Sequence, residues 1–257
     1  MLFPDSPRVL YGKNPLVQVI MQIRFPQILR IASDLPADFQ DRIRDDYPLY
    51  REKREASIGL PAGLEKLLPS EALPKSDVAY EFSSDDGNWT LSLTSGFLAL
   101  SCRCYERWEG FSERLEPGMT ALRDIYKPQF FTRLGLRYQN LITRSALEID
   151  GTDWKELLEP HISGEMATEI APQIAHIARE MRVESDDGTK VQVRHGFVPR
   201  TDGDEICYSI DADFFTDSRL TNDQISPTLD NYHIEAGRLF RWCISERLHT
   251  AMDPQAI

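Results

Sequence analysis

The sequence predicts an α+β fold of two similar units, each a strand, a helix, a three-stranded antiparallel meander and a long amphipathic helix. Three observations predict this fold. Short turns join stretches in which every second residue is apolar, and two long stretches have the apolar spacing of an amphipathic helix. The order of these elements also occurs twice. We place the units at residues 1–128 and 129–257, as two domains or one fused domain, each sheet being covered by its long helix.

In the first unit, alternating apolar residues predict a half-buried strand, and the next helix is expected to begin near Pro36 and to end at Pro48. The charged run 42–55 is interpreted as the solvated surface of a helix. A break is expected at Pro117 in the long helix. The predicted elements are a strand at 15–25, a helix at 36–48, a Pro-rich loop at 56–76, strands near 78–82, 89–93 and 98–104, and a helix at 107–126.

In the second unit the pattern restarts with a strand at 130–142. Leu134, Leu136 and Tyr138 lie on one face of this strand, and Arg133 and Arg137 lie on the other. For the last helix, Ser226 is expected to be the N-cap, with Pro227 at the first helical position. The predicted elements after the strand are a helix from Asp153, a short helix near 165–172, strands at 176–185, 189–198 and 205–214, and a helix at 226–252.

Three local matches favour an internal duplication over chance recurrence of common turns. They are the apolar-Arg-aromatic strand ends around Arg24 and Arg137, the Ser-Asp-Asp-Gly turns at 84–87 and 185–188, and the Gly-Phe pairs at 96–97 and 196–197. The two units could share one continuous sheet, or they could form two sheets packed through their helices.

Composition and charge limit where in the cell the protein is expected and which partners it can bind. The chain has 257 residues and a net charge of −12. It has no run of about 18 apolar residues, which a membrane-spanning helix needs, and no basic start followed by an apolar stretch, which a secretion signal needs. We therefore expect a soluble cytoplasmic protein with no membrane partner. Nucleic acid is also an unfavoured partner, because a negative surface repels phosphate backbones.

The sequence lacks motifs for catalysis and for cofactor binding. It has no Walker-type loop, dinucleotide fingerprint or Gly-x-Ser-x-Gly elbow, and its histidines form no His-x-x-x-His pair. We therefore expect no cofactor and favour a protein that is not an enzyme. One alternative is a metal site at Asp211 and Asp213, which lie two apart on one strand. A solvent-facing side of an antiparallel sheet is the interpretation we favour for this pair.

Arginines are the stronger candidates for ligand binding. Arg24 and Arg137 occupy matched positions in the two units, and Arg133 and Tyr138 lie beside Arg137. Clustered guanidinium groups on a sheet can hold a phosphate or a carboxylate. The competing interpretation, which we favour, is a set of structural ion pairs with acidic residues of the covering helix.

Parts of the chain resemble an uncharacterised, sporadically distributed family of bacterial proteins of about this length. The resemblance lies in residues 11–26, 36–44 and 133–140, and the Asn14-Pro15-Leu16 opening is its most specific part; Gly135-Leu136-Arg137-Tyr138 belongs to it as well. It implies no activity and no catalytic residues. The patchy distribution of such families implies a link to mobile elements or defence.

Three functions follow as hypotheses. The leading one is a non-enzymatic accessory or binding protein that acts through contacts with another protein or through self-association, such as a homodimer. The second is a module that binds a small anionic ligand in a pocket between sheet and long helix, lined by Arg24, Arg137 and nearby aromatic residues. The third is a metal-dependent hydrolase or nuclease that uses Asp211 and Asp213.

Overall fold

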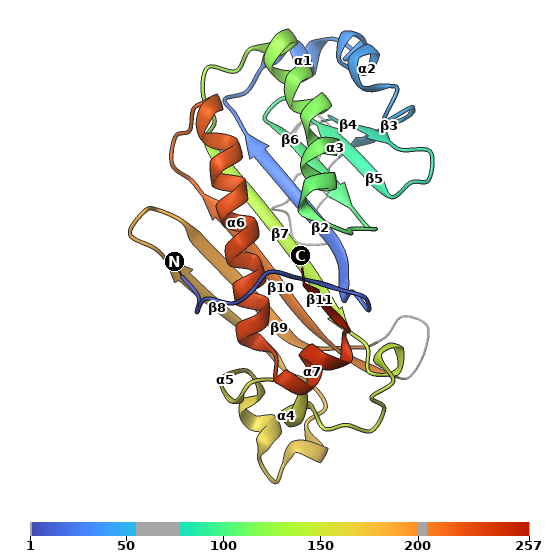
Figure 1. The fold of residues 1–257 in the computed structure, drawn as a ribbon. Coiled ribbons are helices and arrows are strands. Elements are labelled where there is room, and N and C mark those ends of the chain that lie inside the picture. Colours follow the sequence, from blue (N-terminus) through green and yellow to red (C-terminus); the bar gives the residue numbers. More distant parts are fainter. Residues whose placement is uncertain (1, 55–77, 200–204, 257) are drawn as a thin grey trace, which may run out of the picture.

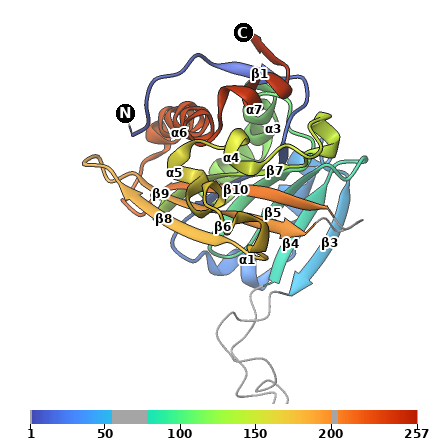
Figure 2. The ribbon, with the colours of Figure 1, turned by 90° about the horizontal axis from the view of Figure 1, so that it is seen from below.

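The computed structural model describes residues 2–54, 78–199 and 205–256. Within these residues, nine strands form one twisted sheet, in the order β3-β4-β5-β6-β2-β7-β10-β9-β8, and every neighbouring pair is antiparallel (Figure 2). The strands are β2 (Leu16–Arg24), β3 (Leu49–Arg54), β4 (Val78–Ser83), β5 (Trp89–Leu93), β6 (Phe97–Cys102), β7 (Arg133–Ile142), β8 (Ala178–Glu184), β9 (Lys190–Pro199) and β10 (Ile206–Thr216).

The two long helices, α3 and α6, lie on the same face of this sheet (Figures 1 and 2). The helices are α1 (Leu29–Ser33), α2 (Ala37–Ile43), α3 (Trp108–Ala121), α4 (Trp154–Leu157), α5 (Pro160–Ser163), α6 (Asn222–Cys243) and α7 (Glu246–Ala251). A two-stranded ribbon of β1 (Val9–Tyr11) and β11 (Pro254–Ala256) joins the two ends of the chain. The prediction of a mixed α and β fold with antiparallel pairing is confirmed. Among the helices described, none is long and apolar enough to cross a membrane.

The sheet is continuous across the boundary that the sequence placed at residues 128 and 129. Strands β2 and β7 pair at its centre, with Gln22 opposite Gly135. Of the two arrangements left open above, the edge-to-edge sheet is the one found.

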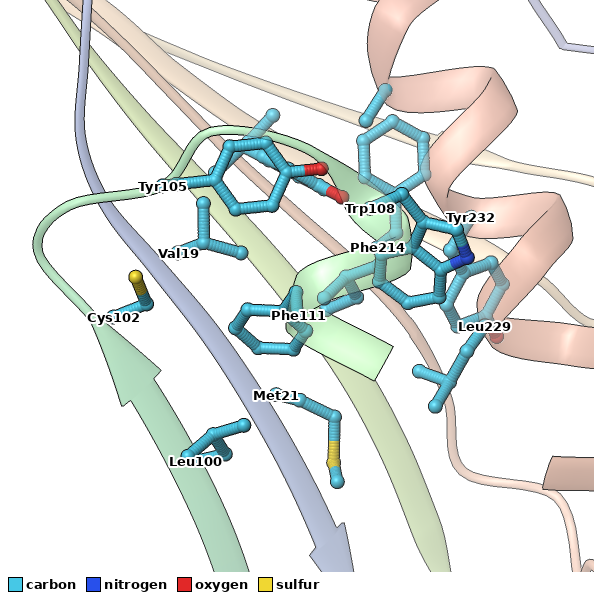
Figure 3. Packing of buried hydrophobic residues seen from close by; sticks show 14 of the residues in the cluster. Val19, Met21, Leu100, Cys102, Tyr105, Trp108, Phe111, Phe214, Leu229 and Tyr232 are labelled. Carbon is cyan, nitrogen blue, oxygen red and sulfur yellow. The ribbon is translucent and has the colours of Figure 1, made fainter. Parts of the chain in front are cut away.

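The core lies between the sheet and the helices. On β2, Val19, Met21 and Ile23 are fully buried, and they pair with buried residues of β7. Figure 3 shows this packing, with Val19 and Met21 of β2 to the left of Leu229, which comes from α6 on the right. Removing such side chains from water stabilises the fold by about 2 kcal/mol each. Because side chains alternate along a strand, the residues between them face away from the helices.

Several predictions for the first unit are corrected. Residues 49–54 form a strand, β3, so the charged run 42–55 is not the surface of one helix. The side chain of Arg51 on β3 contacts Glu81 on β4, and such cross-strand pairs support a strand despite its polar composition. Helix α3 continues through Pro117 without a break, and the irregular part follows as a π-helical turn at Leu122–Tyr126. The predicted loop at 56–76 lies outside the described residues.

The helices of the second unit also begin and end elsewhere than predicted. The expected helix from Asp153 is two single turns, α4 and α5, separated just before Pro160, because the residue before a proline disfavours helical geometry. Helix α6 begins at Asn222, where Thr221 and Gln224 form a capping box. Ser226 is therefore not its N-cap, and Pro227 lies inside the helix.

The three matches between the units differ in structure. The two Ser-Asp-Asp-Gly turns are alike: Gly87 and Gly188 both have positive φ, and each donates its N–H to the serine three residues earlier. The Gly-Phe pairs are not alike, because Gly96 precedes β6 whereas Gly196 lies within β9. In the third match, Gln22 of β2 pairs with Gly135 of β7. Arg24 lies two residues after Gln22 and Arg137 lies two residues after Gly135, so the two arginines occupy symmetric positions about this pair.

Candidate functional site

A cavity of about 160 Å³ lies on the helix side of the sheet, above β7. Three parts of the chain enclose it: the N-terminal segment 6–16, the residues 105–108 that lead into α3, and the second half of α6. Its walls are mostly apolar. A site of this kind, with a few polar groups in an apolar hollow, is typical of small-molecule binding.

Two tyrosines and a histidine supply polar groups to the cavity lining. The hydroxyl of Tyr138 on β7 shares a hydrogen bond of 3.0 Å with Nδ1 of His233 on α6. The ring of His233 stacks on Trp108, with centroids 5.0 Å apart and planes 7° from parallel. The indole N–H of Trp108 donates to Asp230, 2.8 Å away, so the stack is fixed at both ends.

Among the described residues, the hydroxyl of Tyr105 makes no hydrogen bond of good geometry, although the residue is only 9% exposed; the hydroxyl of Tyr138 is near enough to interact with it weakly. The neighbouring backbone is well fixed, since Asn14 donates to the carbonyl of Tyr105 at 3.0 Å. The ring of Tyr105 meets that of Tyr138 edge to face, with centroids 5.8 Å apart. A buried hydroxyl without a partner costs about 1 to 3 kcal/mol, so this group is available to a ligand.

These polar groups are neutral at pH 7. Burial raises the pKa of Tyr105 and of Tyr138 well above the usual value for tyrosine. Burial, together with the positive charge of Arg8, lowers the pKa of His233 to about 4. The interior of the cavity therefore offers hydrogen bonds without a charge of its own.

Charged groups in the cavity lining are mostly arginines: Arg8, Arg107, Arg238 and Arg241, with Glu106 as the only carboxylate among the described residues there. Arg8 forms a two-bond pair with Glu109 at 2.8 and 3.0 Å. Arg238 pairs with Glu235 and Asp5, and Arg241 bonds the carbonyl of Ile244 and the carboxylate of Glu246. Three of the four arginines are therefore paired with carboxylates, and Arg107 has no ion pair among the described residues.

The N-terminal segment forms one wall, and buried contacts fix it. The backbone N–H groups of Leu2 and Phe3 both donate to the buried carboxylate of Glu235 on α6, at 2.9 and 3.2 Å. Further along, the hydroxyl of Tyr11 shares a hydrogen bond of 2.8 Å with His249 of α7. In Figure 1 this segment crosses α6 to reach β1.

The titration of His233 predicts a pH-dependent stability. Its pKa in the folded state, about 4, lies below the ordinary value of 6.5, so the unfolded chain binds the proton more readily. The stabilisation is present above pH 6.5 and is lost as pH falls towards 4, by about 3 kcal/mol at 1.36 kcal/mol per pKa unit. Of the charged groups around the ring, Arg8 lowers the pKa of His233, whereas Glu109 and Asp230 raise it. Burial, which lowers this pKa, has a larger effect than the two carboxylates.

Denaturant unfolding at pH 7 and pH 4 checks this prediction. Wild type is expected to lose about 3 kcal/mol more than the His233→Gln variant does over this interval. His176 is exposed, so His176→Gln is the matched control and should follow wild type. Equal pH dependence in wild type and His233→Gln would contradict the prediction.

The structure separates the four residues that the sequence proposed for ligand binding. Tyr138 lines the cavity, whereas Arg24, Arg133 and Arg137 alternate with cavity-side residues and face the opposite side of the sheet. The expectation that Arg24 and Arg137 line a pocket under the long helix is therefore corrected.

The arginines of the opposite face form ion pairs with the two aspartates once considered as metal ligands. Arg137 bonds both oxygens of Asp211, at 2.7 and 2.5 Å, and Arg133 bonds Asp213 at 2.9 Å. These acidic partners come from the neighbouring strand β10, not from a covering helix as expected. Gly135 makes room for this arrangement, since a Cβ there would lie 2.6 Å from the guanidinium of Arg133.

Guanidinium groups bond to the carboxylates of both aspartates, which are the oxygens that a metal ion at this pair would use. Burial raises the pKa of Asp213 despite the nearby arginines. Among the described residues, no group of three or more His, Cys, Asp or Glu side chains is arranged to hold a metal ion. The aspartates are accounted for as members of the ion pairs.

The sequence interpretation missed Tyr105, Trp108 and His233. One signal for His233 was present, since it precedes Ala236 and Phe240 by three and seven positions and so lies on the same side of α6. Tyr105 lies in a connection between a strand and a helix, where no periodic pattern reveals burial.

No protein-family model matches this chain, and no curated protein is similar to it at a significant level. The resemblance noted above stays a prediction, and the functional argument depends on the site.

Proposed function

We propose that this protein is a non-enzymatic binding module that holds a small molecule in the cavity between β7 and α6. The observation that carries the proposal is the hydroxyl of Tyr105, which is buried at the cavity and has no hydrogen bond of good geometry to any described residue. Buried polar groups in folded proteins almost always have a hydrogen-bond partner. A bound molecule with a hydrogen-bonding group would supply the missing one.

The size of the cavity limits the ligand. At about 160 Å³ it is close to engineered cavities of about 150 Å³ that take up benzene. A molecule with one ring and one polar group therefore suits it. Trp108, which stacks on both His233 and Phe111, contributes aromatic surface to the lining against which such a ring can pack.

The protonation states support binding rather than catalysis. A general base works best with a pKa near the working pH, and His233 has a pKa of about 4. The tyrosines are shifted in the other direction, so they are weak acids at neutral pH. Groups of this kind are suited to hydrogen bonding.

We also propose that residues 1–128 and 129–257 arose by duplication of one unit. Outward from β2 the sheet continues with β6, β5 and β4, and outward from β7 it continues with β10, β9 and β8, which is the same order by chain position. The matched Ser-Asp-Asp-Gly turns connect β4 to β5 and β8 to β9, which are corresponding strands. In this view the cavity lies beside the seam between the units.

A fragment screen tests the binding proposal. Single-ring fragments carrying one polar group are added to the protein, and melting temperature and amide NMR shifts are recorded. A fragment at 100 times its Kd should stabilise the fold by about 2.7 kcal/mol. We expect hits to shift the resonances of Tyr105, Trp108 and His233. Failure of all fragments to bind, or shifts confined to the Arg133 and Arg137 face, would contradict the proposal.

A further inference from the structure

The ligand class can be inferred from the charges around the cavity; this step rests on the function proposed above. Four arginines and one glutamate contribute to its lining, in a chain whose net charge is −12. Three of these arginines are paired with carboxylates, so among the described residues the unpaired positive charge of the lining is that of Arg107, which attracts anions and repels cations.

Arg8 retains free hydrogen-bonding capacity. Its bonds to Glu109 use Nη1 and Nη2, one donor on each, and a guanidinium has five N–H donors. The pair is open to water, with side chains 42% and 52% exposed, so it gains little from the mutual attraction. A second carboxylate could therefore bond to Arg8 without displacing a buried partner.

Arg107 adds a charge that the fold does not use. It is exposed and makes no ion pair with any residue that the structure describes. It lies directly before Trp108, at the start of α3, and both Arg107 and Arg8 contribute to the cavity lining.

The buried end of the cavity can use a hydrogen-bond acceptor. The hydroxyl of Tyr105 has no hydrogen bond of good geometry to any described residue, and the electrostatic influence of Arg8 extends to Tyr105, Tyr138 and His233. A carboxylate oxygen can accept from both a tyrosine hydroxyl and a guanidinium. An ammonium or amidinium group could donate to the tyrosine oxygen, but it could not bond to the guanidinium of Arg8 and would be repelled by it.

We propose that the ligand is a small monocarboxylic acid with a single ring. Its carboxylate accepts hydrogen bonds from Tyr105 and Arg8, and its ring lies against the apolar wall beside Trp108.

Three probes of nearly equal shape test this class: benzoate, benzamide and benzamidine, which are negative, neutral and positive. Titration calorimetry on the full chain should give a Kd for benzoate at least about tenfold below that for benzamide, and no binding of benzamidine. A tenfold ratio is 1.4 kcal/mol. A higher salt concentration should weaken the binding of benzoate and leave the binding of benzamide unchanged.

Two variants locate the effect. Arg8→Gln should raise the Kd for benzoate to about the Kd for benzamide. The Kd for benzamide should not change, and this result would show that the cavity is intact. Arg42 forms an exposed pair with Asp124 and does not line the cavity, so Arg42→Gln is the matched control and should bind like wild type.

The outcomes separate the two proposals. Equal affinity for benzoate and benzamide, or preference for benzamidine, overturns the ligand class and leaves the binding module standing. If none of the three probes binds while other fragments do, the ligand class again falls alone. If no fragment of any kind binds, the proposed function falls with it.

Discussion

The Gly237→Leu variant is expected to lose ligand binding while keeping the fold. Gly237 lies on α6, is exposed and lines the cavity, and a Cβ built there has no heavy atom of the described residues within 4 Å. A leucine side chain can therefore enter the open space without moving its neighbours. It should also stabilise α6, because glycine costs about 1 kcal/mol in a helix relative to residues such as alanine or leucine. The expected result is a higher melting temperature with at least about a hundredfold weaker binding of any cavity ligand.

A matched variant distinguishes filling of the cavity from a change in helix stability. Gly110 lies on α3, also has no heavy atom within 4 Å of a built Cβ, and does not line the cavity. Gly110→Leu should stabilise its helix to a similar extent and bind ligand like wild type. Unchanged binding in Gly237→Leu would show that ligands bind elsewhere.

The Gly196→Ala variant is expected to lose about 3 kcal/mol of the free energy of unfolding, or more. A Cβ at position 196 would lie 2.0 Å from the backbone oxygen of Ile177 and 2.8 Å from its carbonyl carbon. Backbone atoms cannot turn aside as a flexible side chain can, so β8 and β9 must separate. The clash also threatens the bond from the N–H of Phe197 to that same oxygen, now 2.9 Å long. Denaturant midpoints provide the measurement.

The control for this variant is Gly96→Ala, at the position that the sequence pattern matched with Gly196. The nearest heavy atom to a Cβ there is the oxygen of Phe25, 4.0 Å away, which is ordinary contact. We expect a change of less than about 1 kcal/mol at position 96. Similar losses in both variants would mean that the close approach of Ile177 to Gly196 does not determine the result.

Strands were predicted well where alternation was strong. Residues 15–25 and 130–142 became β2 and β7, because each has a buried face and an outward face. Strand β3 was missed because its run of charged residues has no alternation of apolar and polar side chains. It lies at the edge of the sheet, where charged side chains are common because they prevent pairing with another chain. Helix ends were missed where proline was given too much weight: Pro227 lies within α6, and the cap is Thr221, in a capping box, five residues before the predicted cap Ser226.

The candidate site could be predicted only in part. Tyr138 lines the cavity, yet alternation alone places Arg137 on the opposite face, so the two could not share a pocket. The cavity itself depends on the N-terminal segment crossing α6 and on the connection that contains Tyr105. Such long-range contacts between irregular segments leave no periodic pattern in a sequence. The missing partner of Tyr105 is visible only once the fold has buried it.

Intermolecular NOEs between a bound ring acid and the protein test the central claim most directly. With benzoate at saturation, the account predicts contacts from its ring protons to the side chains of Trp108 and Tyr138, which line the cavity. It also predicts that Tyr105→Phe weakens binding about tenfold, the loss of one hydrogen bond to a charged group. Contacts to Phe215, which lies beside Arg133 on the opposite face of the sheet, with none to Trp108, would contradict the account.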